Sequence, residues 1–346
     1  MRGLICATRF DGRSDDSDGL GGMDGTMLSS RSTAQPAMLR QPDEHLARVW
    51  RRSPERLTVV RIDLHTHSAA SDGTDSPAEL VRAAAESGLD VVALTDHDTT
   101  AGWEQALDAA PRGLTVVRGM EMSCEGRGED GSPVPVHLLA YLFDPEDSAF
   151  AEERARLLAE RTARIRAMAE RIAVDYPQFD PDAIMAATGT AAGRPHLARA
   201  LVDIGVVTSI AQAFEGPLST RSPYYVDKVD TPIERAVEMI SAAGGVSVVA
   251  HVRARMRGRI LDLNQVRELA GRRPDGSAGL GGLEVFHADH APEDIRQLAE
   301  LAEELDLLVT GSSDYHGDNK TLSLGEHTTD VEQYERLLAQ SSGLTV

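Results

Sequence analysis

The sequence predicts an α/β fold in which strands alternate with helices. Amphipathic segments such as residues 77–86 separate several short apolar runs, and this alternation is typical of α/β architectures. A second observation is that many of the apolar runs end in His, Asp or Glu. Seven runs read as strands, at about residues 58–64, 90–95, 114–121, 136–142, 245–250, 282–287 and 305–311.

The first of these strands ends in two histidines. His65 and His67 lie two residues apart, and residues i and i+2 of a strand point to the same face. Two imidazoles that converge in this way can share a metal ion. Asp72 follows after a short Ser/Gly-rich turn and adds a carboxylate, which is a hard oxygen ligand. Alone, the His-x-His pair fits a strand end without any ligand role equally well.

The same arrangement recurs along the chain. Asp314 and His316 lie two residues apart after the last strand, at the other end of the sequence. Further candidate ligands end or begin the strands between them: His97, Glu121, His137 and His251. Because chance would not place ligand-type residues at so many strand ends, the pattern predicts a metal site at one rim of a barrel, where the active sites of (β/α) barrels lie.

Taken together, these motifs resemble the PHP (polymerase and histidinol phosphatase) superfamily. The matching motifs are His65-Thr-His67 with Asp72-Gly73, Thr95-Asp-His-Asp98, Glu121, His137, Gly193-Arg-Pro-His196, Ala250-His251 and Asp314-Tyr-His316. The resemblance covers about residues 58–330. In the order and spacing of its motifs, the chain is similar to stand-alone phosphoesterases that act on nucleoside 3′,5′-bisphosphates, AMP-like nucleotides or the 5′ ends of short RNA.

This resemblance implies a distorted seven-stranded (β/α) barrel that holds three divalent metal ions. The implied ligands are His65, His67, Glu121 and Asp314 for the first ion, Asp72, His97 and His316 for the second, and Glu121, His137 and His251 for the third. A mixed nitrogen and oxygen ligand set without thiolates suits Mn²⁺, Fe²⁺ or Zn²⁺, and the resemblance favours Mn²⁺. Neighbouring ions lower the pKa of a bound water and clamp phosphoryl oxygens, which is the chemistry of phosphate ester hydrolysis.

The chain outside these motifs divides into distinct parts. Residues 1–56 are rich in Gly, Ser and Asp and lack apolar periodicity, which is the composition of a disordered extension. Residues 145–243 form the longest interval between candidate ligands, and a long amphipathic helix at 151–172 begins it. We therefore expect an inserted, mainly helical subdomain there, with residues 57–144 and 244–346 forming the barrel. The insert could serve as a lid over the metals or as an oligomer contact.

Charge indicates how a substrate would bind. The net charge of −20 argues against a surface that follows polymeric nucleic acid. Locally, arginines occupy alternate positions from 253 to 259, directly after His251, and guanidinium groups match phosphate oxygens. We expect three cations to bind substrate phosphate: Arg194, Arg255 and Lys228. His196 is the candidate to bind phosphate or to protonate the leaving oxygen, and a structural role for it remains equally open.

These observations favour a phosphatase that acts on a small nucleotide with metal-activated hydroxide. Three alternatives stay open: a 5′-3′ exoribonuclease on short RNA, a histidinol-phosphate phosphatase, and a PHP module without catalytic activity. The exoribonuclease would need an open groove, and the completeness of the ligand set argues against the inactive module.

Little in the sequence points to a membrane or an oxidising compartment. Only two cysteines are present, Cys6 and Cys124, and no apolar stretch approaches the roughly 20 residues that span a bilayer. The first residues lack the pattern of a secretory signal. We therefore expect a cytoplasmic enzyme without a membrane partner, and no motif points to a protein partner.

Overall fold

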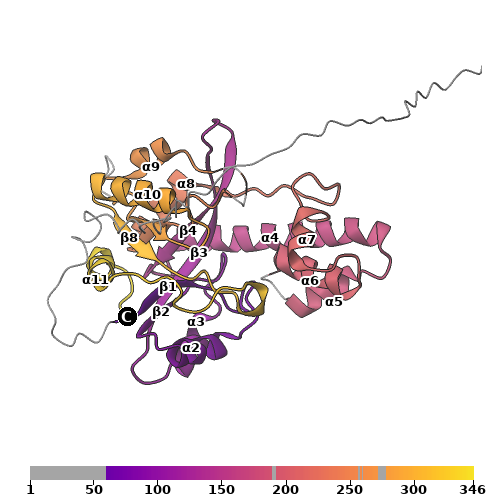
Figure 1. Cartoon of the computed structure of the whole chain (residues 1–346), viewed down its shortest axis with the longest axis horizontal. Coiled ribbons are helices and arrows are strands. Elements are labelled where there is room, and N and C mark those ends of the chain that lie inside the picture. Colours follow the sequence, from indigo (N-terminus) through magenta and orange to yellow (C-terminus); the bar gives the residue numbers. More distant parts are fainter. Residues whose placement is uncertain (1–59, 189–191, 256–257, 259, 272–277) are drawn as a thin grey trace, which may run out of the picture. The chain divides into compact units, whose positions relative to one another are not determined.

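The computed structural model describes residues 60–188, 192–255, 258, 260–271 and 278–346, so the extension expected at 1–56 lies outside the described residues. The strands are β1 (Ile62–Thr66), β2 (Val91–Leu94), β3 (Thr115–Arg127), β4 (Pro133–Tyr141), β5 (Thr231–Pro232), β6 (Val246–Val249), β7 (Gly282–Phe286) and β8 (Leu308–Gly311). The helices that pack around them, shown in Figure 1, are α2 (Pro77–Glu86), α3 (Trp103–Ala109), α8 (Ile233–Ala242), α9 (Leu263–Leu269), α10 (Pro292–Glu304) and α11 (Val331–Gln340).

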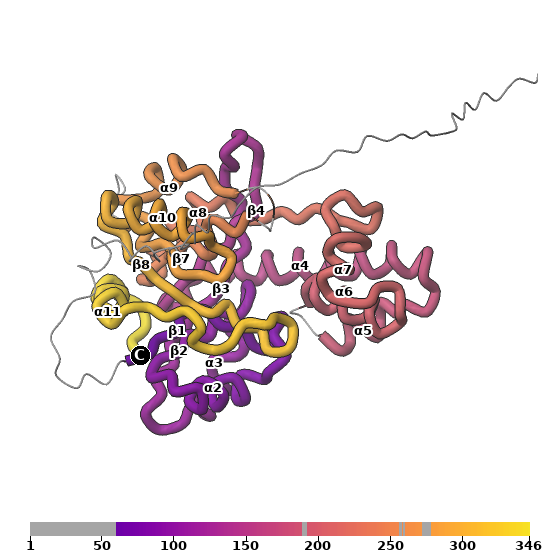
Figure 2. Tube along the Cα trace, in the orientation of Figure 1, coloured from indigo at the N-terminus to yellow at the C-terminus, as the bar shows by residue number. Residues whose placement is uncertain are grey.

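The strands form a nearly closed barrel, which confirms the predicted fold class. Seven strands hydrogen-bond in the order β1-β2-β3-β4-β6-β7-β8, and the two-residue β5 pairs beside β3. The end of β1 meets the segment after β8 at the open seam of the barrel. Thr66 forms a β-bridge with Tyr315, and the His67 N–H donates to the Tyr315 carbonyl at 2.8 Å. Figure 2 shows the indigo start of the barrel beside its yellow end.

One strand runs against the others. β4 is antiparallel to both of its neighbours, β3 and β6, whereas every other neighbouring pair along this order is parallel. The β3–β4 hairpin also extends beyond the ranges expected from sequence, 114–121 and 136–142. Met122 and Cys124 alternate with polar residues and are fully buried in this extension, so packing makes a strand of a segment whose composition resembles a loop.

Alternation along the strands divides the core into two clusters. Val92 and Leu94 pack with the surrounding helices in the larger cluster, whereas Val91 and Ala93 join the smaller cluster formed by the opposite faces of the strands. Side chains at successive positions point to opposite faces, and every residue of β1 and β2 is buried. These strands are therefore buried on both faces.

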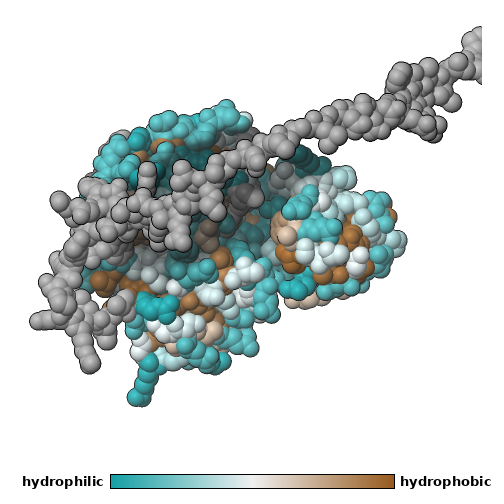
Figure 3. Space-filling model, in the orientation of Figure 1, coloured by the Kyte–Doolittle hydropathy of each residue, from teal (hydrophilic) through white to brown (hydrophobic). Residues whose placement is uncertain are grey.

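The interval expected to hold an insert contains α4 (Ser148–Asp175), α5 (Pro181–Thr188), α6 (Arg194–Asp203) and α7 (Ile210–Glu215). α4 starts in the barrel core, where Phe150 and Leu157 are buried, and ends in a third cluster that it forms with α6, α7 and Phe179. Some apolar side chains of this part remain partly exposed at its surface (Figure 3). α8 packs on β3, β4 and β6. The expected boundaries at 145 and 243 stay a prediction, and these contacts favour a narrower self-packed insert of about residues 165–226.

Helix α2 begins with a complete capping box beside the loop that carries Asp72. The Ser76 hydroxyl accepts a hydrogen bond from the Glu79 N–H at 3.3 Å, and the Ser76 N–H donates to the Glu79 carboxylate at 2.9 Å. We expect Ser76→Ala to lower the free energy of unfolding by about 1 kcal/mol, measured by urea denaturation. Ser87→Ala is the matched control, because Ser87 caps the other end of α2 through its backbone N–H. Equal losses in the two variants would contradict this role for the Ser76 side chain.

Within the described residues, every helix is too short or too polar to span a bilayer.

Candidate metal centre

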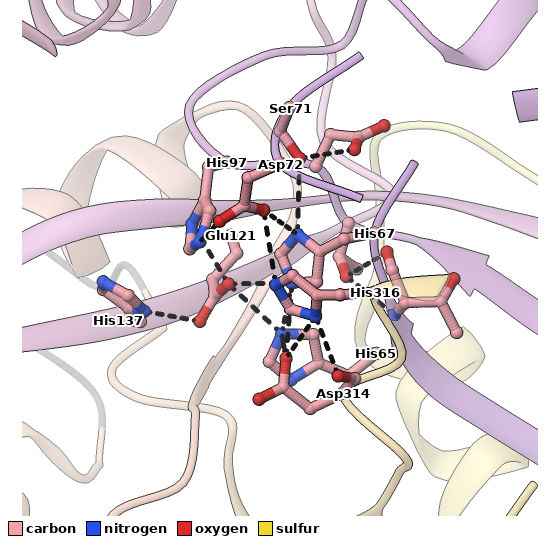
Figure 4. A network of polar contacts seen from close by, with 12 residues as sticks. His65, His67, Ser71, Asp72, His97, Glu121, His137, Asp314 and His316 are labelled. Atoms are coloured by element: carbon pink, nitrogen blue, oxygen red, sulfur yellow. Dashed lines mark hydrogen bonds and ion pairs between the residues drawn. The ribbon is translucent and has the colours of Figure 1, made fainter. Parts of the chain in front are cut away.

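The strand directions bring the predicted ligands to one rim of the barrel. His65 lies in β1, Glu121 in β3 and His137 in β4. The other ligands lie in the segments that follow β1, β2, β6 and β8. His137 lies near the middle of β4, opposite Ser123. Because β4 is antiparallel, its first half reaches the rim where the parallel strands end. Figure 4 shows imidazoles and carboxylates from these elements converging on one place.

Glu121 is the centre of this cluster. Its Oε1 lies 2.7 Å from His137 Nδ1 and 3.0 Å from His251 Nε2, and its Oε2 lies between 3.0 and 3.2 Å from three further imidazoles: those of His65, His67 and His97. Burial alone would raise the pKa of the Glu121 carboxyl, but the surrounding imidazoles hold this pKa well below its ordinary range. A permanently ionised carboxylate whose two oxygens face different groups of nitrogens is suited to bridge two cations.

The Nε2 atoms of His65 and His67 lie close enough to bind one metal ion together. His65 Nε2 and His67 Nε2 lie 3.0 Å apart. The His65 Nδ1 donates to Glu284 at 3.0 Å, and the His67 Nδ1 lies 3.4 Å from the Ser71 hydroxyl, which gives its own proton to Asp96. When both imidazoles are neutral, both Nε2 atoms present lone pairs to the same point. A metal ion there would be ligated by both nitrogens, while the partners on Nδ1 hold the orientation of each ring.

A second group of ligands adjoins the first. His67, Asp72, His97 and His316 each offer a ligand atom within 4.8 Å of the others. The His316 Nδ1 donates to the Asp314 carbonyl at 2.8 Å, so its Nε2 is left to face Asp72 Oδ1 at 3.3 Å. Burial lowers the pKa of His97 well below its ordinary value and keeps this imidazole neutral. Among the described residues, no hydrogen bond reaches the buried Asp72 Oδ1, which fits an oxygen that binds a cation.

All nine predicted ligands therefore meet in one cluster, but the groups differ from those implied by resemblance. His67 joins both the first and the second group, and His97 also forms a third group with Glu121 and His137. Asp314 Oδ1 lies 3.5 Å from both His65 Nε2 and His67 Nε2. The assignment of individual residues to individual ions remains a prediction.

Two supporting residues escaped the sequence analysis, Glu284 and Arg161. Glu284 accepts from His65 Nδ1, from the His251 N–H and from Ser312. Burial would raise its pKa, but the charge of His65 holds this pKa far below the ordinary range. An acidic residue inside the apolar run 282–287 was the signal that could have identified it. Asp98 is held by Ser123 and by Arg161 of α4 at 2.7 Å, a contact between distant segments that no local pattern reveals.

A cavity of about 710 Å³ opens beside the metal ligands. Its walls include Asp72, His97, His137 and His251 from the barrel rim, and residues of α4, α6 and the segment before β5 from the other side. Binding sites for small molecules have volumes of roughly 300–1,000 Å³. Five cationic side chains line it within the described residues: Arg161, Arg164, Arg194, Lys228 and Lys320.

Arg194 lines this cavity. Its guanidinium is stacked near Phe214 and Tyr225, at 5.2 and 5.9 Å from the ring centroids, and Arg164 lies 5.0 Å from the centroid of Tyr225. Burial and the nearby Arg164 lower the pKa of Arg194 to about 10, so it stays charged at neutral pH. Among the described residues, no ion pair joins Arg194 to a carboxylate; its Nη1 donates to the Leu218 carbonyl at 3.4 Å, and a guanidinium has further donors for an anion.

The other predicted substrate residues differ in their surroundings. Lys228 lines the cavity and pairs with Asp230 at 2.7 Å. His196 accepts the Gly193 N–H on Nδ1 at 2.9 Å and caps the start of α6, and burial lowers its pKa. Its proposed catalytic role remains a prediction.

The expectation for Arg255 needs correction. Within the described part of the chain, this residue does not line the cavity. Its guanidinium pairs with Asp294 at the start of α10 at 2.6 Å, and about half of the side chain is exposed. Arg253, two positions earlier, is buried against Glu129, while Arg257 and Arg259 lie outside the described residues. Arg253 and Arg255 therefore pair with acidic residues of other elements instead of lining the cavity.

Comparison with known proteins identifies relatives of the whole barrel. The PHP domain model matches residues 63–199. A 5′-3′ exoribonuclease of Haemophilus influenzae is 34% identical over 283 residues, which cover 79% of this chain and 96% of the relative. A 3′,5′-nucleoside bisphosphate phosphatase of Chromobacterium violaceum is 32% identical over 277 residues, which cover 79% of this chain and 93% of the relative.

A solved structure shows the same architecture. A crystal structure from Bifidobacterium adolescentis, of a protein provisionally described as a metal-dependent phosphoesterase, superposes with a TM-score of 0.74 at 36% identity. The match covers 82% of this chain and 97% of that one. The similarity therefore includes the barrel and the helical segment inserted in it.

Proposed function

Because this chain belongs to the PHP domain family, we propose that it is a metal-dependent phosphoesterase that removes a phosphate from a small nucleotide, with a nucleoside 3′,5′-bisphosphate as the favoured substrate. The observation that carries the proposal is the cavity beside the metal ligands, whose opposite wall contains Arg164 and Arg194. One end of a bisphosphate would lie at the metal centre, and its second phosphate would meet these guanidinium groups.

The residues at the rim fit divalent ions. We propose three ions, held by His65, His67, Asp72, His97, Glu121, His137, His251, Asp314 and His316, with Mn²⁺ as the preferred metal. When bound, such ions supply a hydroxide near neutral pH and neutralise the phosphoryl oxygens. Glu284 fixes the tautomer of His65, and the Asp314 carbonyl does the same for His316, so that each imidazole presents Nε2 to the centre.

The remaining residues of the cavity orient the substrate. Phe214 and Tyr225 hold Arg194 in place, which reduces the entropy lost when the guanidinium binds a phosphate. Lys228 adds a further cation to the same cavity. The size and the two-sided polarity of this cavity favour a mononucleotide over RNA, although the Haemophilus relative is an exoribonuclease.

The proposal is tested by measuring product release from the full-length chain reconstituted with Mn²⁺. The substrates are adenosine 3′,5′-bisphosphate, AMP, histidinol phosphate and a short 5′-phosphorylated RNA followed for mononucleotide release. We expect the highest kcat/KM with the bisphosphate. A preference for RNA would replace the proposal with the exoribonuclease, and a preference for histidinol phosphate would refute the nucleotide assignment. If all four stay intact while metal is bound, the enzyme proposal fails.

Arg194→Ala is expected to raise KM for the bisphosphate by about tenfold or more while kcat changes little. A hydrogen bond to a charged group is worth about 1.5–3 kcal/mol, and a group that grips a non-reacting phosphate acts on binding rather than on the chemical step. The variant should also lose most of the preference for bisphosphate over AMP.

Arg166→Ala is the matched control, because Arg166 lies on α4 but pairs with Asp182 on the exposed side. A fall in kcat at unchanged KM would place Arg194 at the reacting phosphate instead.

A further inference from the structure

Lys320 stands apart from the other cations of the cavity. Arg161, Arg164, Arg194 and Lys228 all come from the interval 145–243, whereas Lys320 follows the last barrel strand. Its Nζ lies 2.5 Å from the carboxylate Oδ2 of Asp314, one of the predicted metal ligands, and the side chain is 29% exposed. Lys320 is therefore at once in contact with the metal centre and open to the cavity.

The loop that carries Lys320 is fixed to the loop of another ligand. The Asn319 side chain donates to the Asp72 carbonyl at 2.8 Å, and the Asp318 N–H donates to the Thr74 hydroxyl at 2.9 Å. Gly317, which directly follows the ligand His316, adopts a positive φ of 62°. A Cβ at this position would lie 1.9 Å from the Thr74 hydroxyl. This close approach sets the position of Lys320 relative to Asp72 and Asp314.

The two oxygens of Asp314 have different surroundings. Oδ1 faces His65 and His67, where an ion would bind, and Oδ2 faces Lys320 and His287 Nε2, the latter at 3.3 Å. An ion held by Oδ1 and the ammonium held at Oδ2 would thus lie on neighbouring sides of one carboxylate. A lysine ammonium has three donors, so the contact with Asp314 leaves others for an oxygen that comes from the cavity.

We propose that Lys320 is a catalytic residue that binds the reacting phosphoryl group. This inference rests on the proposed phosphoesterase function. The ammonium donates hydrogen bonds to a phosphoryl oxygen and supplies positive charge as negative charge develops during attack and departure of the leaving oxygen. Arg194 and its neighbours grip the second phosphate, so the two ends of the cavity have separate tasks.

The inference is tested with Lys320→Met and Lys320→Arg in the full-length, metal-saturated protein. Three quantities are measured: metal content by mass spectrometry, the Kd for inorganic phosphate by calorimetry, and kcat for the best substrate. For Lys320→Met we expect unchanged metal content, a Kd raised about tenfold or more and a kcat lowered about a hundredfold. Lys320→Arg keeps a cation and should retain phosphate affinity within a few-fold of the wild type.

Arg199→Met is the matched control, because the Arg199 guanidinium holds the Asn319 side chain of the same loop at 3.3 Å without lining the cavity in the described structure. An unchanged Kd for phosphate in metal-saturated Lys320→Met would overturn the inference. If that unchanged Kd were accompanied by a reduced metal content before saturation, the role of Lys320 would be to hold Asp314.

Failure of the wild type to bind phosphate would also overturn the inference. A wild type that binds phosphate through Lys320 but hydrolyses no substrate would refute the proposed function and leave the binding role of Lys320 supported.

Discussion

Glu121→Gln is expected to lower kcat by more than about a hundredfold and to reduce the metal content, while the barrel stays folded. Glu121 approaches five imidazoles with its two oxygens, and glutamine keeps the shape but removes the negative charge and one acceptor. Partners that only orient a metal ligand are already worth about 10–100-fold, so the loss of a bridging ligand should exceed that range. Metal content by mass spectrometry, kcat and the circular dichroism spectrum measure the three effects.

Glu125→Gln provides the control on the same strand. Glu125 lies four residues further along β3 and is exposed, so its loss of charge should leave both metal content and kcat at the wild-type level. Full activity in Glu121→Gln with a complete set of ions would remove Glu121 from the metal centre.

Removal of the divalent ions should abolish activity and lower Tm, and this difference in Tm should grow between pH 6 and pH 8. A ligand that binds only the folded state at about a thousandfold excess over its Kd adds roughly 4 kcal/mol. Without metal, burial works against protonation of His65, but Glu121, Glu284 and Asp314 raise its pKa well above 6.5. The raised pKa means that protonated His65 stabilises the metal-free protein fully below about pH 6.5. This contribution is lost as the pH rises through the raised pKa.

Metal binding has the opposite dependence on pH, because each imidazole must give up its proton to become a ligand. The metal-free protein therefore becomes less stable over the range in which metal affinity increases. Calorimetric Tm values with and without chelator, at pH 6, 7 and 8, measure the gap. Glu121→Gln is the control, since its gap should be small at every pH. A gap that shrinks with rising pH in the wild type would show that His65 does not change its proton when metal binds.

The features that sequence could predict are those encoded within a few residues. His65 and His67 share a face because of the two-residue period of a strand, and the capping box of α2 is visible as Ser76 and Glu79. The fold class also follows from the alternation of strands and helices. These parts of the fold required only local geometry.

The features that sequence could not predict depend on long-range contacts. The pairing of Arg161 with Asp98 joins residues 63 positions apart. The acidic partners of Arg253 and Arg255 likewise come from other elements, which is why the arginines after His251 looked like a phosphate site. The direction of β4 depends on its pairing with β3 and β6. The position of His137 near the start of the apolar run 136–142 therefore indicates a place at the ligand rim only once this antiparallel pairing is known.

Helix α4 links the barrel core to the insert core and carries two of the cavity arginines. This helix is an uninterrupted rod of 28 residues, about 42 Å long at 1.5 Å per residue, with one end embedded in the barrel and the other in the insert. Arg161 and Arg164 are carried on it, between Leu157 of the barrel core and Ile165 of the insert core. Under the proposed function, α4 would therefore set the distance between the metal centre and the arginines that meet the second phosphate. Adding one residue before Arg161 would turn the two arginines by about 100° away from the cavity, so the spacing could be reset only in steps close to a whole helical turn.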